Sequence, residues 1–264
     1  MIDIHNHMLP AVDDGAKNDD VALSMLKEAV RQGVEHLVLT PHLYEADIIK
    51  GTGEWKAKIE AGKRTVMELI EKHELPVEVT VAAEVRYQDM LPIILDELEV
   101  LIGGKYLLLE FAFHSVPNNL ERIIYDITRK GIIPIIAHPE RIKPWQGDPQ
   151  RLEELINMGC PTQLDIGSFL GKLGPNTEKL ANFLFDRDAV HLVGSDSHNL
   201  ESRAVYAKPG YDWISERYDS EYADLLLKIN PGKILRGDPV EVYPVRLEPE
   251  TLSLKDKFLN IFKS

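Results

Sequence analysis

Short apolar runs alternate with longer segments of helical periodicity along most of the chain. The runs consist mainly of Val, Ile and Leu, as expected for strands that are buried on both faces. They occupy residues 2–4, 36–40, 78–82, 106–110, 133–137, 163–166 and 190–194. The helical segments occupy residues 19–32, 55–72, 91–101, 120–129, 150–158 and 177–185. This alternation predicts a parallel sheet with helices packed against it.

Polar side chains that can bind metals follow nearly every predicted strand at its carboxyl end. These candidates are His5, His7, Asp14, His42, Glu84, Glu110, His138, Asp196 and His198. Such strand ends converge on one mouth in a closed barrel, whereas an open sheet would spread the same residues along an edge. We therefore predict an α/β fold, a distorted TIM-like (β/α)7 barrel over residues 1–240. Residues 241–264 form a C-terminal tail with a candidate amphipathic helix over 252–263.

The types and spacing of these residues point to metal binding. His5 and His7 are two residues apart in a strand, so both imidazoles can face one cation. Glu110 follows three leucines, and a carboxylate in such apolar surroundings requires a partner or a metal. A mixed nitrogen and oxygen ligand set suits manganese, iron or zinc rather than calcium. Nine ligands exceed the needs of one ion and predict two or three divalent ions.

Composition and charge exclude several other classes of protein. The chain is 44% hydrophobic and 28% charged, which is ordinary for a globular domain. Its net charge is -13 and it has no run rich in Lys or Arg, so we do not expect nucleic-acid binding. The apolar runs are too short for membrane insertion, and a start without a signal segment predicts a cytoplasmic protein.

The sequence around the single cysteine, Cys160, decides whether the chain could be a cysteine-dependent phosphatase. A cysteine-dependent tyrosine phosphatase requires an arginine six positions after the nucleophile, but Ile166 stands at that position. We therefore expect Cys160 to be a packed core thiol.

The ordered motifs resemble those of a known group of proteins. They are His5-Asn6-His7, Thr40-Pro41-His42, Glu84-Val85-Arg86, His138-Pro139-Glu140-Arg141 and Ser195-Asp196-Ser197-His198. This series resembles the PHP (polymerase and histidinol phosphatase) superfamily and, more narrowly, the CpsB/YwqE-type bacterial tyrosine-protein phosphatases. The resemblance extends from Met1 to about Pro239.

The resemblance implies a trinuclear centre, usually of manganese, in a metal-dependent phosphatase. It implies one ligand set of His5, His7, Glu84 and Asp196, a second of Glu84, Glu110 and His138, and a third of Asp14, His42 and His198. It also implies that Arg86 and Arg141 bind phosphate. The implied substrate is a phosphotyrosine-bearing kinase, or its peptide tail, that controls capsule or exopolysaccharide synthesis.

Other functions remain open at this stage. A related phosphoesterase could act on a small molecule such as histidinol phosphate, or on a nucleic-acid diester. A regulatory module could keep the fold without turnover, although the complete ligand series argues against it. Oligomerisation is also open. An activity panel with metal analysis distinguishes these alternatives.

Overall fold

The computed structural model describes residues 1–88, 91, 95 and 100–247. The strands are β1 (Ile2–Asn6), β2 (His36–Leu39), β3 (His42–Leu43), β4 (Glu78–Val81), β5 (Glu84–Arg86), β6 (Tyr106–Glu110), β7 (Ile133–Ala137), β8 (Thr162–Asp165) and β9 (Leu192–Gly194). The helices are α1 (Asp19–Arg31), α2 (Glu45–Ile49), α3 (Gly53–Lys72), α5 (Leu120–Thr128), α6 (Lys143–Gly147), α7 (Gln150–Asn157), α8 (Ile166–Phe169), α9 (Pro175–Phe185), α10 (Ala207–Arg217), α11 (Ser220–Asp224) and α12 (Asn230–Leu235). A 3₁₀ turn, η2 (Pro139–Arg141), follows β7, and a π-helical turn, η3 (Leu225–Ile229), precedes α12.

All strand pairs among the named strands are parallel, and they form two sheets. One has three strands in the order β1-β2-β4, and the other has six in the order β3-β5-β6-β7-β8-β9. Two of the predicted strands, 36–40 and 78–82, are each followed by a short strand that was not predicted, β3 and β5 respectively. Thr40 and Pro41 separate β2 from β3, and Pro41 has no N–H to donate to the ladder.

The prediction of parallel strands and packed helices is confirmed, but a continuous closed barrel is not found among the described strands. Two edge strands, β1 of one sheet and β9 of the other, approach each other without forming a ladder. An isolated bridge joins Asn6 to Ser197, and the N–H of His7 donates to the carbonyl of Ser197 at 2.9 Å. Pairing stops there because the chain leaves strand geometry at Asp196, whose φ is +46°.

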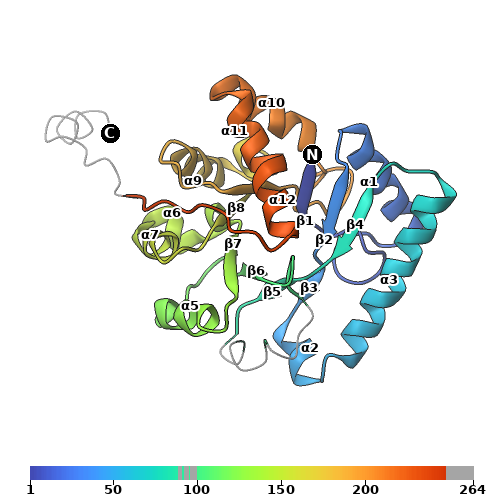
Figure 1. Ribbon diagram of the computed structural model, residues 1–264, viewed down its shortest axis with the longest axis horizontal. Helices are drawn as coiled ribbons and strands as arrows, with labels where there is room; N and C mark the ends of the chain where they lie inside the picture. Colours follow the sequence, from blue (N-terminus) through green and yellow to red (C-terminus); the bar gives the residue numbers. More distant parts are fainter. Residues whose placement is uncertain (89–90, 92–94, 96–99, 248–264) are drawn as a thin grey trace, which may run out of the picture.

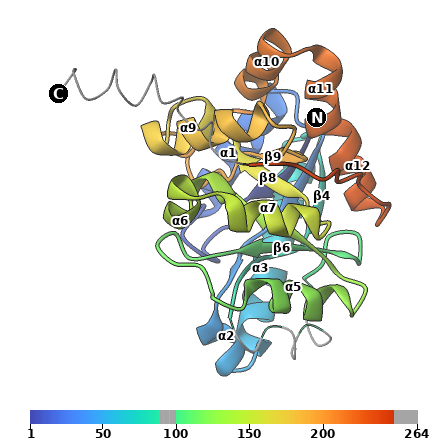
Figure 2. The same cartoon turned by 90° about the vertical axis from the view of Figure 1, so that its left-hand side faces the viewer.

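The buried side chains form two apolar layers, one inside the strands and one outside. The inner cluster takes residues from strands of both sheets, including Ile4, Val38, Leu108, Ile135 and Leu192. The larger cluster lies between the strands and the surrounding helices. Figure 1 shows α1 and α3 on one side of the strands and α6, α7 and α9 on the other, and Figure 2 shows the same arrangement from the side.

Helix α1 illustrates how local sequence sets an element. The side chain of Asn18 caps its start by accepting from the N–H of Val21 at 3.0 Å, and its first turn is acidic. Met25 and Leu26 are fully buried on its inner face. Gly33 has a φ of +83° and ends the segment, as the sequence predicts.

Some predicted segments lie outside the described residues. The predicted helix over 91–101 is described only at residues 91, 95, 100 and 101, and the candidate helix over 252–263 is not described. The described part of the tail lies along α7. The backbone of Val245 exchanges two hydrogen bonds with the side chain of Asn157, and the N–H of Leu247 donates to Glu153 at 2.5 Å. None of the described helices has the length and apolar composition needed to cross a membrane.

Candidate metal centre

The nine candidate ligands converge at the carboxyl ends of the strands. Eight of them are buried, and Asp14, with 61% of its side chain exposed, lies at the rim. Each comes from a strand end or from the loop that follows it, as the sequence predicts. Glu110 shows why. It lies two residues after Leu108 on β6, so its side chain points to the same, inward-facing side of the strand and reaches the mouth.

Four side chains surround the first candidate metal position. The Nε2 atoms of His5 and His7 lie 3.4 Å apart. Oε2 of Glu84 lies 3.3 Å from the first nitrogen and 3.4 Å from the second. Oδ1 of Asp196 lies 3.4 and 3.3 Å from the same two nitrogens. Two imidazoles and two carboxylates thus direct ligand atoms at one small volume.

Glu84 connects this position to a second one. Its Oε1 lies 2.8 Å from Nε2 of His138, and its Oε2 lies 2.9 Å from Nδ1 of His42. Glu110 lies 3.9 Å from His138 and 3.8 Å from His42. Because both oxygens of Glu84 face different histidines, this carboxylate has the geometry of a bridge between two ions.

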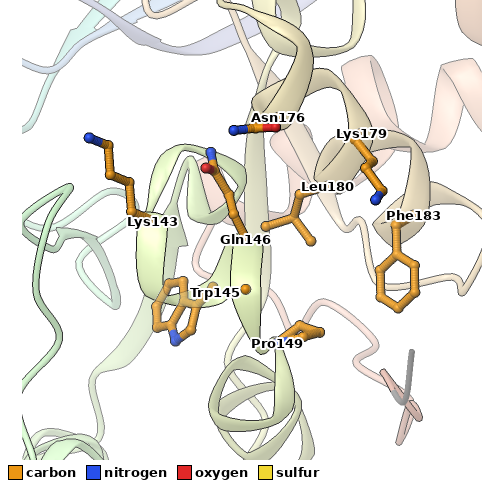
Figure 3. A pocket seen from close by; sticks show the side chains of 9 residues that line it. Lys143, Trp145, Gln146, Pro149, Asn176, Lys179, Leu180 and Phe183 are labelled. Carbon is orange, nitrogen blue, oxygen red and sulfur yellow. The ribbon is translucent and has the colours of Figure 1, made fainter. Parts of the chain in front are cut away.

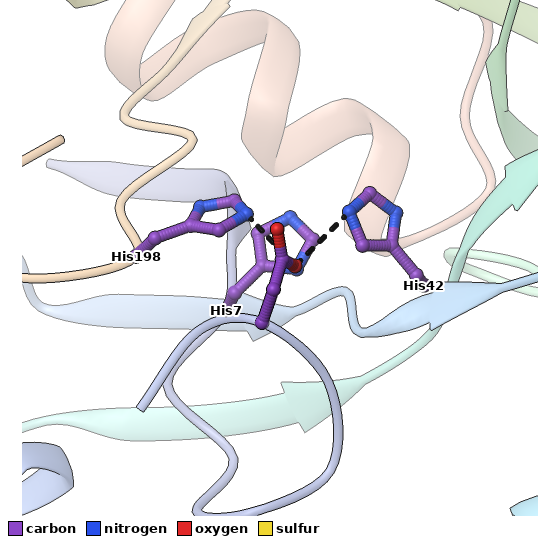
Figure 4. Close-up of side chains that lie close together, drawn as sticks. His7, His42 and His198 are labelled. Atoms are coloured by element: carbon purple, nitrogen blue, oxygen red, sulfur yellow. Dashed lines mark ion pairs between the residues drawn. The ribbon is translucent and has the colours of Figure 1, made fainter. Parts of the chain in front are cut away.

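The third group lies at the open side of the site. Asp14 is 3.4 Å from Nε2 of His42 and 3.3 Å from Nε2 of His198, and dashed lines in Figure 4 mark these ion pairs. The ring of His7 packs 3.9 Å from that of His198 and 4.5 Å from that of His42. Figure 4 shows these three imidazoles meeting from separate segments of the chain.

Unpartnered polar atoms indicate that this arrangement fits metal ions. Within the described part of the chain, six buried atoms of the candidate ligands have no hydrogen-bond partner. They are Nδ1 of His42, Oε2 of Glu84, Oε2 of Glu110, Nδ1 of His138, Oδ1 of Asp196 and Nε2 of His198. Most of these atoms face other candidate ligands in ion-pair contacts, as Nδ1 of His42 faces Oε2 of Glu84. Polar atoms without hydrogen bonds are costly in a protein interior, and coordination to cations would satisfy them.

Neighbouring groups orient the imidazoles. Nδ1 of His7 lies 2.7 Å from Asp13, and Nδ1 of His5 lies 2.7 Å from Oε1 of Gln163. Holding one ring nitrogen in this way directs Nε2 of each histidine at the centre. The loop that carries Asp13 is tight against β1, because the N–H of Ala16 donates to the carbonyl of His7 at 2.9 Å. Gly15 allows this approach, since a Cβ there would overlap His7.

The electrostatics of the site follow from this crowding. Burial opposes ionisation of Glu84, but His5 and its neighbouring histidines hold the pKa of Glu84 well below its usual range. Burial and the charge of Glu84 raise the pKa of Glu110 to about 7. Burial lowers the pKa of His138 to about 4, so this ring is neutral and able to coordinate at pH 7.

Comparison with known proteins agrees with this geometry. The family model for capsular polysaccharide synthesis proteins CpsB/CapC matches residues 1–236. The chain belongs to the CpsB/CapC family. Tyrosine-protein phosphatase YwqE of Bacillus subtilis is 34% identical over 243 residues, which cover 91% of this chain and 93% of that protein. Tyrosine-protein phosphatase CpsB of Streptococcus pneumoniae is 35% identical over 244 residues, covering 89% of this chain and 98% of its own length.

A solved structure supports the same assignment to the CpsB/CapC family. It comes from work on YwqE of Bacillus subtilis and CpsB of Streptococcus pneumoniae, described as unique metal-dependent tyrosine phosphatases. It matches with a TM-score of 0.84 and 29% identity over 95% of this chain and 100% of the other.

Three arginines surround the metal centre of this CpsB/CapC-family chain. Arg141 forms an ion pair with Asp196 and stacks 4.6 Å from the ring centroid of Phe113. Nε of Arg86 lies 3.1 Å from Glu110. Both residues were predicted from the sequence to face the mouth.

The third arginine, Arg203, was not predicted. It also forms an ion pair with Asp196. A turn brings it back to the site, because Oδ1 of Asn199 accepts from the N–H groups of Glu201 and Arg203 at 2.9 and 3.1 Å. The signal in the sequence was Asn199 itself, a residue that favours such turns.

Cys160 has the buried position that the sequence predicts. Its side chain is fully buried, and burial raises the pKa of its thiol to about 12. It therefore supplies no thiolate at neutral pH, and the CpsB/CapC-family centre does not depend on cysteine chemistry.

Proposed function

We propose that this chain is a cytoplasmic, metal-dependent phosphatase that hydrolyses phosphotyrosine on protein. The observation that supports it most is the cluster of His5, His7, Glu84 and Asp196, whose ligand atoms lie close to one another. Two of these atoms, Oε2 of Glu84 and Oδ1 of Asp196, have no hydrogen-bond partner among the described residues. The names of the relatives supply the substrate class. We further propose that the two sheets act as one distorted (β/α)7 barrel, whose mouth is the metal centre.

In this proposal the ligands divide into three groups, and Glu84 belongs to the first two. The first group is His5, His7, Glu84 and Asp196, the second is Glu84, Glu110 and His138, and the third is Asp14, His42 and His198. Divalent ions held there, with manganese first and iron or zinc as alternatives, supply Lewis-acid stabilisation and a nucleophile at neutral pH.

The arginines bind and orient the phosphate in this proposal. The planar guanidinium of Arg141 can hold two phosphate oxygens, and its stacking on Phe113 restricts its orientation. Arg203 pairs with the same carboxylate of Asp196 as Arg141, and Arg86 pairs with Glu110, so both add positive charge where negative charge develops. Phosphoryl transfer depends mainly on such positioning and electrostatics, and no covalent phosphoenzyme is needed.

We propose that the physiological substrate is a kinase of capsule or exopolysaccharide synthesis that carries phosphotyrosine. The family's assignment to capsular polysaccharide synthesis supports this partner.

A substrate panel tests the proposed function. The purified protein is assayed with a phosphotyrosyl peptide, a phosphoseryl peptide, histidinol phosphate and a nucleotide diester, before and after chelation and after addition of Mn²⁺. We expect metal-dependent hydrolysis, fastest on the phosphotyrosyl peptide. Preference for histidinol phosphate would indicate a small-molecule phosphatase instead. A metal-loaded protein that hydrolyses none of them would be a non-catalytic module.

A further inference from the structure

A cleft of about 670 Å³ lies between α6 and α9, beside the loop that carries Arg141. Its size is typical of ligand sites, and nine residues line it. Figure 3 shows Lys143 and Lys179 on opposite sides with Leu180 between them, and Phe183 next to Lys179. The metal centre does not include any of these residues.

The charge of the cleft differs from that of the whole chain. The chain carries a net charge of -13, yet the lining contains two lysines and no carboxylate. Both lysines are exposed, and neither forms an ion pair within the described residues. The carboxylate of Glu178, the residue before Lys179, lies beside Gly171. Arg187 stacks 3.8 Å from the ring centroid of Phe183 and extends the positive charge.

The cleft is structurally connected to the metal centre. Lys143 follows Arg141 by two residues, and its N–H donates to the carbonyl of Phe113 at 2.8 Å. The ring of Phe113 in turn lies 5.6 Å from that of His138. On the same wall, the amide of Gln146 donates to the carbonyl of Glu140 at 2.9 Å. Lys143 therefore lies where the cleft and the mouth of the metal centre adjoin.

We propose that this cleft binds an acidic segment of the substrate polypeptide next to its phosphotyrosine, an inference that rests on the proposed function. Carboxylates of the segment pair with Lys143 and Lys179, and an apolar side chain packs on Leu180 and Phe183. An extended peptide advances roughly 3.3 Å per residue, so a few residues suffice to pass from the metal centre into the cleft. The first turn of α9, which carries Asn176, adds the positive end of a helix dipole.

Paired substrates and the full-length, metal-loaded enzyme test this proposal. Two phosphotyrosyl peptides differ only in whether the flanking residues are Glu or Gln, and p-nitrophenyl phosphate serves as a small substrate. The variants are Lys143→Ala/Lys179→Ala and the control Lys63→Ala, an exposed lysine on α3 at the other side of the molecule. We expect the double substitution to raise KM for the Glu peptide about fivefold, with little change for the Gln peptide or the small substrate. The control keeps the wild-type preference.

The outcomes separate this inference from the proposed function. If the enzyme hydrolyses phosphotyrosine but the double variant keeps its preference for the Glu peptide, the docking proposal is wrong. The docking proposal is also wrong if that preference stays intact while the substitutions change the sedimentation coefficient. The change would show that the cleft binds a second copy of this chain. If no phosphotyrosyl substrate is hydrolysed, the proposed function fails. Fluorescence anisotropy of a labelled, unphosphorylated Glu peptide then tests the cleft alone, and equal binding by wild type and double variant overturns it.

Discussion

Two of the candidate ligands, His138 and Asp196, have backbone conformations in the left-handed region. Their φ values are +31° and +46°. This conformation costs a residue other than glycine roughly 1–2 kcal/mol and persists only where the surroundings enforce it. At both positions the chain leaves a strand, and the change of direction sends the side chain into the mouth rather than along the strand axis. The strained backbone conformations therefore occur at two residues whose side chains point into the candidate metal site.

The convergence of the nine candidate ligands could be predicted because each lies at the end of a strand or in the loop after it, where parallel strands place side chains together. The pairing within the site could not be predicted, because it depends on backbone torsions such as those of His138. Arg203 was missed because it lies five residues beyond His198, in a loop without periodicity. The contact by which Gln163 orients the ring of His5 was not predicted either. The sequence does not show which group a polar residue in a strand will contact.

The first prediction concerns the shape of the Arg141 side chain. If its planar fork holds phosphate, Arg141→Lys lowers kcat/KM almost as much as Arg141→Ala, by about 100-fold, because an ammonium cannot replace the two parallel donors. Steady-state kinetics with a phosphotyrosyl peptide measures this. Arg129→Lys is the matched control, since Arg129 stacks on Tyr125 away from the centre. Near-normal efficiency of Arg141→Lys would contradict the phosphate role.

The second prediction concerns Cys160. Cys160→Ser should keep turnover within about twofold, while a buried hydroxyl costs roughly 1–3 kcal/mol of unfolding free energy. Turnover at equal metal content and urea denaturation measure the two effects. Loss of turnover in a folded variant with normal metal content would show that the thiol takes part in catalysis.

At the scale of elements, the apolar runs located seven of the nine named strands, and the short strands β3 and β5 were not predicted. The run over 36–40 became β2 alone because Pro41 breaks the ladder before His42. That break separates β2, in the three-stranded sheet, from β3, in the six-stranded sheet, and it accounts for much of the difference from a continuous barrel. Helices α10, α11 and α12 were not predicted, since this region lacks the regular strand–helix alternation that identified the others.

The third prediction concerns the segment formed by α2 and α3. Nε1 of Trp55 donates to the backbone carbonyl of His42 at 2.8 Å, and the ring of His42 stacks on Tyr44. Trp55→Phe removes the donor but keeps most of the bulk, so we expect Mn²⁺ affinity to fall roughly tenfold. Calorimetric titration measures this, with Trp213→Phe as the control in a separate aromatic cluster. Equal Mn²⁺ affinities in the two variants would show that the hydrogen bond of Trp55 does not stabilise the metal centre.

At the scale of the whole molecule, the candidate metal centre joins segments that lie far apart in the chain, from His5 to His198. A ligand that binds only the folded state stabilises it, by about 2.7 kcal/mol at a free concentration near 100 Kd. We therefore predict that chelation lowers the melting temperature by about 5–10 °C and that Mn²⁺ restores it. Differential scanning calorimetry measures the shift. A melting temperature that is insensitive to chelation, in protein whose metal content is shown to change, would contradict a centre that joins these segments.

The fifth prediction concerns the pH dependence of the metal-free protein. Burial lowers the pKa of His42, but Asp14 and Glu84 oppose this and raise it to about 9. Because this folded-state pKa exceeds the unfolded one, its contribution is complete below about pH 6.5 and is lost as the pH rises through about 9. Glu110 changes the stability in the same direction. Burial raises its pKa to about 7, so its carboxyl ionises less readily in the folded state than in the unfolded state.

We therefore expect the metal-free protein to lose stability between about pH 7 and 9, while its affinity for metal increases over the same range as the histidine proton is released. Urea denaturation of the chelated protein and Mn²⁺ titration at each pH measure the two trends. Stability of the metal-free protein that rises with pH in this window would contradict these ion pairs.

The contact between β1 and the end of β9 also determines when the centre can form during translation. A polypeptide leaves the ribosome from its N-terminus and folds as it emerges. His5 is released early, whereas Ser195, which donates to its carbonyl, lies 190 residues later. A nascent chain without β9 presents His5, His7 and Glu84 but lacks the carboxylate of Asp196 that completes the first ligand group. If these residues bind metal as proposed, tight metal loading waits until the segment that carries Asp196 and His198 has left the exit tunnel. Truncated translation products that end before β9 lack these two candidate ligands.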